Sequence, residues 1–282
     1  MTLSRGARGL LLGAAGLTLA FLYVPLLVIF VDAFSTATTL EWPPPGFTTH
    51  WFGDAIDNPG AREAFFNSLK AGAAATAIAI VLGTLGSLAV ARHRFFGRET
   101  ISFLVVLPIA LPGIVTGIAL NSTFTQVFGI DLSLFTIVVG HATFCIVVVY
   151  NNVLARLRRL STSFEEASAD LGAHTWQTFR FVTLPNLRTA LVAGGLLAFA
   201  LSFDEIIVTT FTAGSGVQTL PIWIFTNLQR PNQLPIVNVV AVLVILISIV
   251  PVYLAHRLTR EEDGGTGRGG GREVAAEASA VP

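Results

Sequence analysis

The sequence is poor in charged residues, which make up 12% of its 282 residues, and rich in hydrophobic ones, which make up 53%. A soluble domain carries about 25% charged residues, so this composition argues against one. Seventeen basic residues balance seventeen acidic ones, and the zero net charge excludes a nucleic-acid-binding protein that relies on a basic surface. A mean hydropathy of +0.71 instead indicates a membrane protein.

Cysteine and lysine are almost absent. Cys145 is the only cysteine, which excludes an internal disulfide and a thiolate metal cluster. Lys70 is the only lysine, and it follows Leu69 rather than glycine, so the chain has no Walker A sequence and no P-loop of its own. The five histidines show neither HExxH nor another ligand spacing, and we predict no metal site.

Long hydrophobic runs occur throughout the chain. A bilayer core of ~30 Å requires about 20 apolar residues in a helix. The first run is too long for the apolar part of a signal peptide, and Pro25 stands where cleavage requires small residues, so we expect a retained helix. The sequence predicts an all-α membrane protein with six transmembrane helices, over residues 10–31, 71–90, 101–120, 132–154, 189–211 and 236–254.

Basic residues gather on one side of the predicted membrane. Positively charged loops stay in the cytoplasm, so we expect this side to be cytoplasmic, with both termini on it. The opposite side carries Arg62, Lys70 and Arg230. The cytoplasmic side carries the other fourteen basic residues: Arg5, Arg8, Arg92, Arg94, Arg98, Arg156, Arg158, Arg159, Arg180, Arg188, Arg257, Arg260, Arg268 and Arg272.

The composition divides the chain into a transmembrane domain, residues 1–260, and a tail, residues 261–282. The tail is rich in glycine, glutamate and alanine, so we expect it to be disordered. Residues 212–235 form an outer connection with several glycines and prolines, in which residues 220–228 are expected to form a short interfacial or re-entrant helix.

The cytoplasmic segment 155–188 is long for a loop between spans. Ser163 is a candidate N-cap, and Glu165 and Glu166 suit the positive end of a helix that begins there. Gly172 can adopt the left-handed conformation that ends such a helix.

A second short helix is expected to pass through Trp176 and Phe179, and Pro185 is expected to stop it. Two short helices at an angle would present a docking surface to the cytoplasm.

This segment resembles the membrane subunits of bacterial ABC importers. Their pattern is Glu-Ala-Ala, three residues, Gly, nine residues, then Ile-x-Leu-Pro. Serine replaces the second alanine and valine replaces isoleucine, and both changes are mild. The matching positions in this chain are Glu166, Ala167, Ser168, Gly172, Val182, Leu184 and Pro185.

The resemblance extends over nearly the whole chain, including residues 67–69 at the start of the second span, 107–117 in the third and 201–211 in the fifth. These segments resemble the spermidine/putrescine permeases, specifically the second of the two paired subunits. The resemblance implies a type I ABC importer permease fold in a bacterial inner membrane. The implied partners are a second permease subunit, two cytosolic ATPases, an extracytoplasmic binding protein and membrane lipid, without nucleic acid.

The resemblance also implies that the loop inserts into a groove on an ATPase and couples ATP hydrolysis to transport. Glu166 would pair with a basic residue of the ATPase, and Gly172 would shape the turn. ATP and Mg²⁺ would be bound by the partner ATPases, so we expect no cofactor and no catalysis on this chain. The residues assigned to coupling are Glu165, Glu166, Ala167, Ser168, Gly172, Leu184 and Pro185.

Two acidic residues, Asp204 and Glu205, interrupt the fifth predicted span. An ionised carboxylate at the bilayer centre costs ~2.5–3.5 kcal/mol, so both should face protein or a watery path. Neighbouring helical residues differ by about 100° in direction, so both cannot face the path equally. We predict that Asp204 lines the path and attracts a polyamine cation, while Glu205 packs against a neighbouring helix or binds an interfacial partner. Alternatively, both lie near the outer interface and serve topology.

Other polar or breaking residues occur within the spans. Pro108 and Pro112 are expected to kink the third span, as a gate hinge or as a static bend, and Gly113 and Gly117 to allow close helix packing. His141 is expected to be buried and hydrogen-bonded, with a proton relay as the alternative. Cys145, in turn, is expected to be a small buried apolar residue.

Two other functions are compatible with parts of the sequence. The first is the same importer with another cargo, such as ferric iron, a phosphonate or another small solute. The second is a proton-coupled secondary transporter that uses Asp204, Glu205 and His141 as a relay. The second leaves the conspicuous cytoplasmic segment 155–188 without a role.

Overall fold

The computed structural model describes residues 4–230 and 232–249. Within these ranges every regular element is a helix, and the one β contact is an isolated antiparallel bridge between Ser35 and Phe47. The chain forms two compact units. The first takes in the described residues up to Arg62 and those from Trp223 to Ser248, and the second runs from Glu63 to Ile222.

Four helices are long and apolar enough to cross a membrane, or five if a bent pair counts as one span. The sixth predicted span begins as a shorter apolar helix, Leu234–Ile249, and its residues from 250 on lie outside the described residues. The disordered tail predicted for residues 261–282 also lies outside them. The four spans are Gly6–Asp32, Pro59–Arg92, Leu134–Arg159 and Thr175–Phe203, and the bent pair is Arg98–Ala110 with Gly113–Val127.

The first unit holds α1 (Arg5–Asp32) and α2 (His50–Asp57). Asp32, at the end of α1, is buried and accepts a hydrogen bond from the side chain of Asn238. The segment between α1 and α2 is held against α2, because the indole Nε1 of Trp51 in α2 donates to the Ser35 carbonyl at 2.8 Å. Hydrogen bonds therefore order a connection in which prolines prevent a helix.

The second span, α3 (Pro59–Arg92), begins well before the predicted residue 71. Asn58 caps it, since its Oδ1 accepts from the Ala61 N–H at 2.9 Å, and Pro59 suits the first helical position. Asn67 and Ser68 therefore lie inside the helix and do not open it, which corrects the prediction.

These two side chains fasten α3 to the segment that precedes α11 (Leu220–Leu228). The Asn67 amide donates to the Gln218 carbonyl at 3.1 Å, and the Ser68 hydroxyl accepts from the Leu220 N–H at 2.9 Å. The short helix predicted over residues 220–228 is confirmed as α11. The bonds give the backbone of this irregular segment partners that lipid cannot supply.

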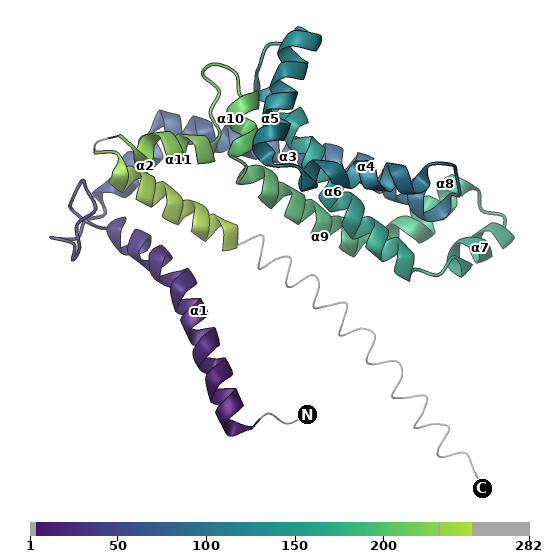
Figure 1. Cartoon of the computed structure of the whole chain (residues 1–282), viewed down its shortest axis with the longest axis horizontal. Coiled ribbons are helices and arrows are strands. Elements are labelled where there is room, and N and C mark those ends of the chain that lie inside the picture. Colours follow the sequence, from purple (N-terminus) through teal and green to yellow (C-terminus); the bar gives the residue numbers. More distant parts are fainter. Residues whose placement is uncertain (1–3, 231, 250–282) are drawn as a thin grey trace. The chain divides into compact units, whose positions relative to one another are not determined.

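The core of the second unit is the contact between α6 (Leu134–Arg159) and α9 (Leu184–Phe203), which lie side by side in Figure 1. Small residues permit the approach, and a Cβ on Gly194 would lie 3.2 Å from the Cβ of Asn152. Close backbone approach at small residues is the usual way in which membrane helices associate. Cys145 lies in this core with no exposed surface, as predicted.

The third predicted span is broken rather than kinked. Its halves, α4 (Arg98–Ala110) and α5 (Gly113–Ser122), meet at 103°. Leu111 takes an extended conformation (φ −80°, ψ 144°), because a residue before proline is disfavoured in the helical region. Pro112 then caps α5, whereas Pro108 remains inside α4. The predicted kink of this span is therefore a complete break at Pro112, while Pro108 does not interrupt α4.

The fifth predicted span is also shorter than expected. α9 ends at Phe203, and a separate short helix, α10 (Ile207–Thr212), follows. Asp204 and Glu205 lie in the turn between them and not within a continuous helix, which corrects the predicted span 189–211. This turn is one of two candidate functional regions, the other being the predicted coupling loop.

Candidate functional site

The predicted coupling loop, residues 155–188, begins inside α6, which extends to Arg159 and not to the predicted residue 154. Its first separate helix is α7 (Ser163–Asp170). The N-cap of α7 is Thr162, whose carbonyl accepts from the N–H groups of Glu165 and Glu166 at 3.0 Å each. Ser163 is the first residue of the helix, so its predicted role as N-cap was wrong by one position.

The end of α7 has the geometry that the sequence predicted. Gly172 has a φ of +83°, and the Ala173 N–H returns to the Ser168 carbonyl at 3.1 Å, as in a left-handed helix end. A Cβ on Gly172 would meet no atom within 4 Å. The backbone conformation alone therefore favours glycine at this position.

The second part of the loop does not end at Pro185. A helical run from Thr175 to Phe203 is unbroken and consists of α8 (Thr175–Thr178), a π turn, and α9. The π turn, Phe179–Thr183, widens the helix just before the proline, where the ring would otherwise clash with a carbonyl one turn back. The prediction that Pro185 stops the helix was wrong, and the loop runs directly into the fifth span.

The two adjacent glutamates of α7 have different surroundings. Glu165 is half-buried and forms an ion pair with Arg92, with 2.9 Å between Glu165 Oε2 and Arg92 Nε. Glu166 is exposed, as is Ala167. Ser168 lies at hydrogen-bond distance from Thr178, with 3.1 Å between their hydroxyl oxygens. Glu166 is thus presented outward, while Glu165 faces the protein.

The two last motif residues lie at the start of α9, where Leu184 is half-buried and Pro185 is exposed. The same loop exposes large apolar side chains. Exposed apolar side chains of this size are typical of a protein interaction surface. The exposed fractions are 59% for Phe164, 89% for Leu171, 61% for Trp176 and 69% for Phe181.

The second region is the turn between α9 and α10. Glu205 is half-buried, and its Oε1 accepts from the Val208 N–H at 2.8 Å, which caps α10. Asp204 is exposed, and its side chain has no hydrogen bond or ion pair with any residue in the described ranges. The two carboxylates therefore differ: that of Glu205 caps α10, whereas that of Asp204 is exposed and has no partner among the described residues.

His141, on α6, holds both sides of this turn. Its Nδ1 lies 2.7 Å from the Ser202 hydroxyl on α9, and its Nε2 lies 2.7 Å from the Thr209 hydroxyl on α10. The ring has no exposed surface. The prediction of a buried, hydrogen-bonded histidine is confirmed.

The direction of this hydrogen-bond chain follows from its last member. The Thr209 hydroxyl donates to the Glu205 carbonyl at 2.8 Å, so its oxygen accepts from His141 Nε2–H. The neutral imidazole then accepts from the Ser202 hydroxyl at Nδ1. This series of hydrogen bonds ends at the backbone carbonyl of Glu205, which cannot take up a proton. The arrangement therefore argues against a proton relay.

Sequence reasoning missed Ser202 and Thr209 as the partners of His141. Seven residues separate them, which is two helical turns, so they share a face in a continuous helix. Hydroxyl groups at this spacing on both sides of an acidic pair were the available signal. The sequence did not show that the helix breaks between them.

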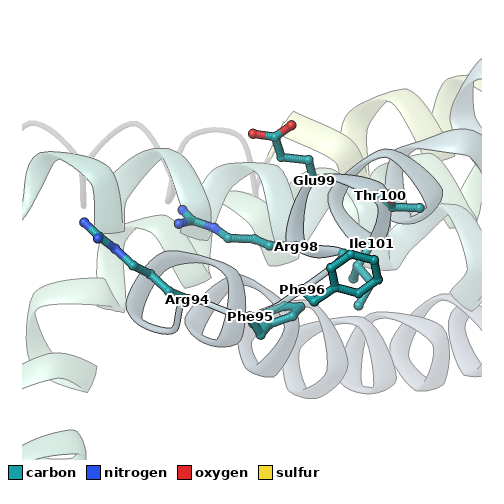
Figure 2. A pocket seen from close by; sticks show the side chains of 8 residues that line it. Arg94, Phe95, Phe96, Arg98, Glu99, Thr100 and Ile101 are labelled. Atoms are coloured by element: carbon teal, nitrogen blue, oxygen red, sulfur yellow. The ribbon is translucent and has the colours of Figure 1, made fainter.

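The basic connection between α3 and α4 lines a hollow of about 730 Å³. In Figure 2 the side chains of Arg94 and Arg98 extend toward the same side, away from the rings of Phe95 and Phe96. Phe96 is fully exposed. None of the predicted coupling or path residues lines this hollow. In the described ranges no group of three or more His, Cys, Asp or Glu side chains could hold a metal ion.

Residues 79–261 match the family described as the binding-protein-dependent transport system inner membrane component. The match covers well over half of the chain, and the chain belongs to this family. It begins within α3, so α1 and α2 precede it.

Among curated relatives, the putrescine transport system permease protein PotI of Escherichia coli (strain K12) is 32% identical over 252 residues, 86% of this chain and 89% of that protein. The spermidine/putrescine transport system permease protein PotC of Haemophilus influenzae is 30% identical over 86% of this chain and 94% of its own length. The putative 2-aminoethylphosphonate transport system permease protein PhnV of Salmonella paratyphi A is 29% identical over 91% of this chain and 94% of that protein.

Solved structures share the fold at low sequence identity. A chain of a bacterial ABC transporter involved in the import of the acidic polysaccharide alginate has a TM-score of 0.69 at 18% identity, covering 93% of this chain and 99% of that one. A chain of the MetNI methionine ABC transporter has a TM-score of 0.59, covering 76% and 99%. The protein is a permease subunit of an ABC importer, a family of non-catalytic membrane subunits.

Proposed function

We propose that this permease imports a polyamine of the spermidine/putrescine class. The observation that carries the cargo is Asp204, an exposed carboxylate without a partner among the described residues, at the break of the fifth span. A bare negative charge attracts a cationic amine and disfavours an anionic phosphonate. The identity of 30–32% to putrescine and spermidine/putrescine permeases supports the same cargo.

The proposed topology has six spans, both termini in the cytoplasm of a bacterial inner membrane, and a permease domain over residues 1–260. Support comes from the charge asymmetry, in which fourteen of seventeen basic residues fall on one side. The four long helices and the bent pair would form five of these spans, and the shorter apolar helix Leu234–Ile249 would begin the sixth.

The proposed assembly contains a second permease subunit, two cytosolic ATPases that bind ATP and Mg²⁺, and an extracytoplasmic binding protein. The exposed apolar side chains of the coupling loop would enter a groove on an ATPase, and the exposed Glu166 would pair with a basic residue there. Burial of Phe164, Leu171 and Trp176 at that contact would remove an apolar patch from water.

The unbroken helix from Thr175 to Phe203 connects the two regions. Its 29 residues span about 44 Å at 1.5 Å per residue. One end carries the coupling loop, and the other ends at Asp204. Displacement of the loop by an ATPase would therefore reach the substrate path through a single rigid element.

Uptake of radiolabelled spermidine and putrescine into proteoliposomes that hold the full complex and its binding protein tests this function. ATP-dependent uptake of a polyamine supports it. Uptake of 2-aminoethylphosphonate instead would show that the cargo is wrong while the importer stands. Polyamine uptake driven by a pH gradient without ATP would favour the secondary transporter.

Gly172→Val tests the coupling role separately. The φ of +83° is strained for a β-branched residue, so α7 would end differently and the docking face would be displaced. We expect transport and ATPase stimulation to be lost while the protein still reaches the membrane. Gly172→Asn is the control, since asparagine tolerates this conformation. Normal coupling in the valine variant would contradict the assignment.

A further inference from the structure

We propose that Arg92 and Thr183 position Glu165 so that α3 moves together with the coupling loop. The Glu165 junction is defined here as these three residues. The inference rests on the proposed coupling function and adds a second route into the membrane, besides the direct continuation of the loop into α9. It concerns Glu165, the residue directly before the motif residue Glu166. Glu166 itself is exposed and takes no part in the junction.

The junction joins three elements that are distant in sequence. Arg92 is the last residue of α3. Glu165 lies in the first turn of α7, 73 positions later in the sequence. Arg92 Nε lies 3.1 Å from Glu165 Oε1 and 2.9 Å from Oε2. Thr183, the last residue of the π turn, donates its hydroxyl to Oε1 at 3.1 Å. One carboxylate therefore holds α3, α7 and the base of α9 together.

The burial of the junction distinguishes it from a surface ion pair. The side chains of Arg92 and Glu165 are 17% and 25% exposed, and Thr183 is buried. Arg92 Nη2 is itself buried and has no hydrogen-bond partner in the described part of the chain. The guanidinium therefore depends on Glu165 for its compensation, since an unpaired charge in a partly buried site is strongly unfavourable.

The neighbouring arginines provide a contrast. Arg94 follows Arg92 by two positions, is exposed, and extends with Arg98 beside the hollow in Figure 2. Neither of these two forms an ion pair within the described ranges. Of these three arginines, Arg92 alone pairs with the loop in the described ranges, and it attaches the loop to the end of α3.

The mechanical consequence follows from what α3 holds at its other end. Asn67 and Ser68 fasten α3 to the backbone at Gln218 and Leu220. A displacement of α7 that pulls on Glu165 would be passed along α3 to this segment. The coupling loop would therefore drive two helices, α9 by covalent continuity and α3 through the Glu165 junction.

The test uses the full complex in proteoliposomes, with Arg92→Gln, Glu165→Gln and the double variant. The readouts are uptake, ATP hydrolysed per cargo molecule imported, and stimulation of the ATPase by the loaded binding protein. We expect each single variant to lower uptake about tenfold and to raise ATP use per cargo. The double variant should be no worse than either single variant, because both remove the same interaction. The matched control, Arg94→Gln, should transport as the wild type does.

A merely structural role would lower the yield of the complex without raising ATP use per cargo. Additive losses in the double variant, or normal coupling in both single variants, would overturn the proposal. A wild-type complex whose ATPase ignores the loaded binding protein would instead show that the proposed function is wrong. If the single variants do not assemble, Thr183→Val and Thr183→Ser decide: uncoupling in the valine variant alone supports the junction, and equal transport in both overturns it.

Discussion

At the break in the third span the backbone itself prevents a helix, whereas at the break in the fifth span side chains hold an interruption that the backbone does not require. Leu111 is extended because Pro112 follows it. Between α9 and α10 there is no proline or glycine, and the turn is held by His141 and by the cap from Glu205. The first break has a local cause in the sequence, whereas the second has none and depends wholly on neighbouring helices.

The two breaks meet in the second unit. Their second halves, α5 and α10, pack together, and the Asn121 amide donates to the Phe211 carbonyl at 2.6 Å. Gly113 lies against Ile207, and Gly117 lies against Phe211, which confirms the predicted close packing at these glycines. The packing of α5 therefore supports α10, the helix that follows the turn with Asp204.

The largest effect is expected for His141→Leu. The variant strands the buried Ser202 hydroxyl and removes both bonds across the turn, which should destabilise the protein by about 2–4 kcal/mol. The measurement is the thermal unfolding midpoint of the purified protein in detergent. Adding Ser202→Ala and Thr209→Val should restore part of the loss, because no buried polar group then lacks a partner. An unchanged midpoint in the single variant would show that the turn does not need this contact.

Gly117→Ala should cost about 1–3 kcal/mol by overpacking. Its Cβ would lie 2.7 Å from Cδ2 of the Phe211 ring and 3.1 Å from the Phe211 Cβ, so α5 or α10 must shift. Gly113→Ala in the same helix is the control, since its Cβ would lie 3.4 Å from Ile207, an ordinary contact. Equal unfolding midpoints for the two variants would argue that the packing of α5 on α10 is loose.

Asp204→Asn should raise the KM for polyamine uptake about tenfold, or ~1.4 kcal/mol, with no change in unfolding midpoint. Glu205→Gln should do the reverse: a weakened cap on α10 lowers the midpoint slightly while KM stays close to wild type. Wild-type uptake kinetics in both variants would remove the proposed path role of this turn.

Pro112→Ala should have the smallest effect, below about 1 kcal/mol. Alanine allows Leu111 to enter the helix, but the packing of α5 against α10 should keep the bend. Distance measurement between spin labels on α4 and α5 checks this expectation. A straightened pair would show that proline alone maintains the break.

How far the sequence determines the structure differs between the two candidate regions. In the coupling loop the motif and the glycine conformation were predictable, because capping and φ > 0 are local properties of a few residues. The continuation past Pro185 was not predictable, since the π turn that accommodates the proline is a property of the whole helix. The Arg92 contact to Glu165 was hidden by the separation of 73 positions.

The sequence by itself determined the membrane class, the apolar segments, the family and the motif of the coupling loop, because hydropathy, proline geometry and motif spacing are encoded within short stretches. It also determined that His141 would be buried and Cys145 apolar. Only the tertiary structure decided that the fifth span stops at Phe203, that Glu205 is used as a cap while Asp204 is free of described partners, and that Glu165 faces Arg92. These outcomes depend on which helices pack together, and contacts between distant residues exist only in the folded chain.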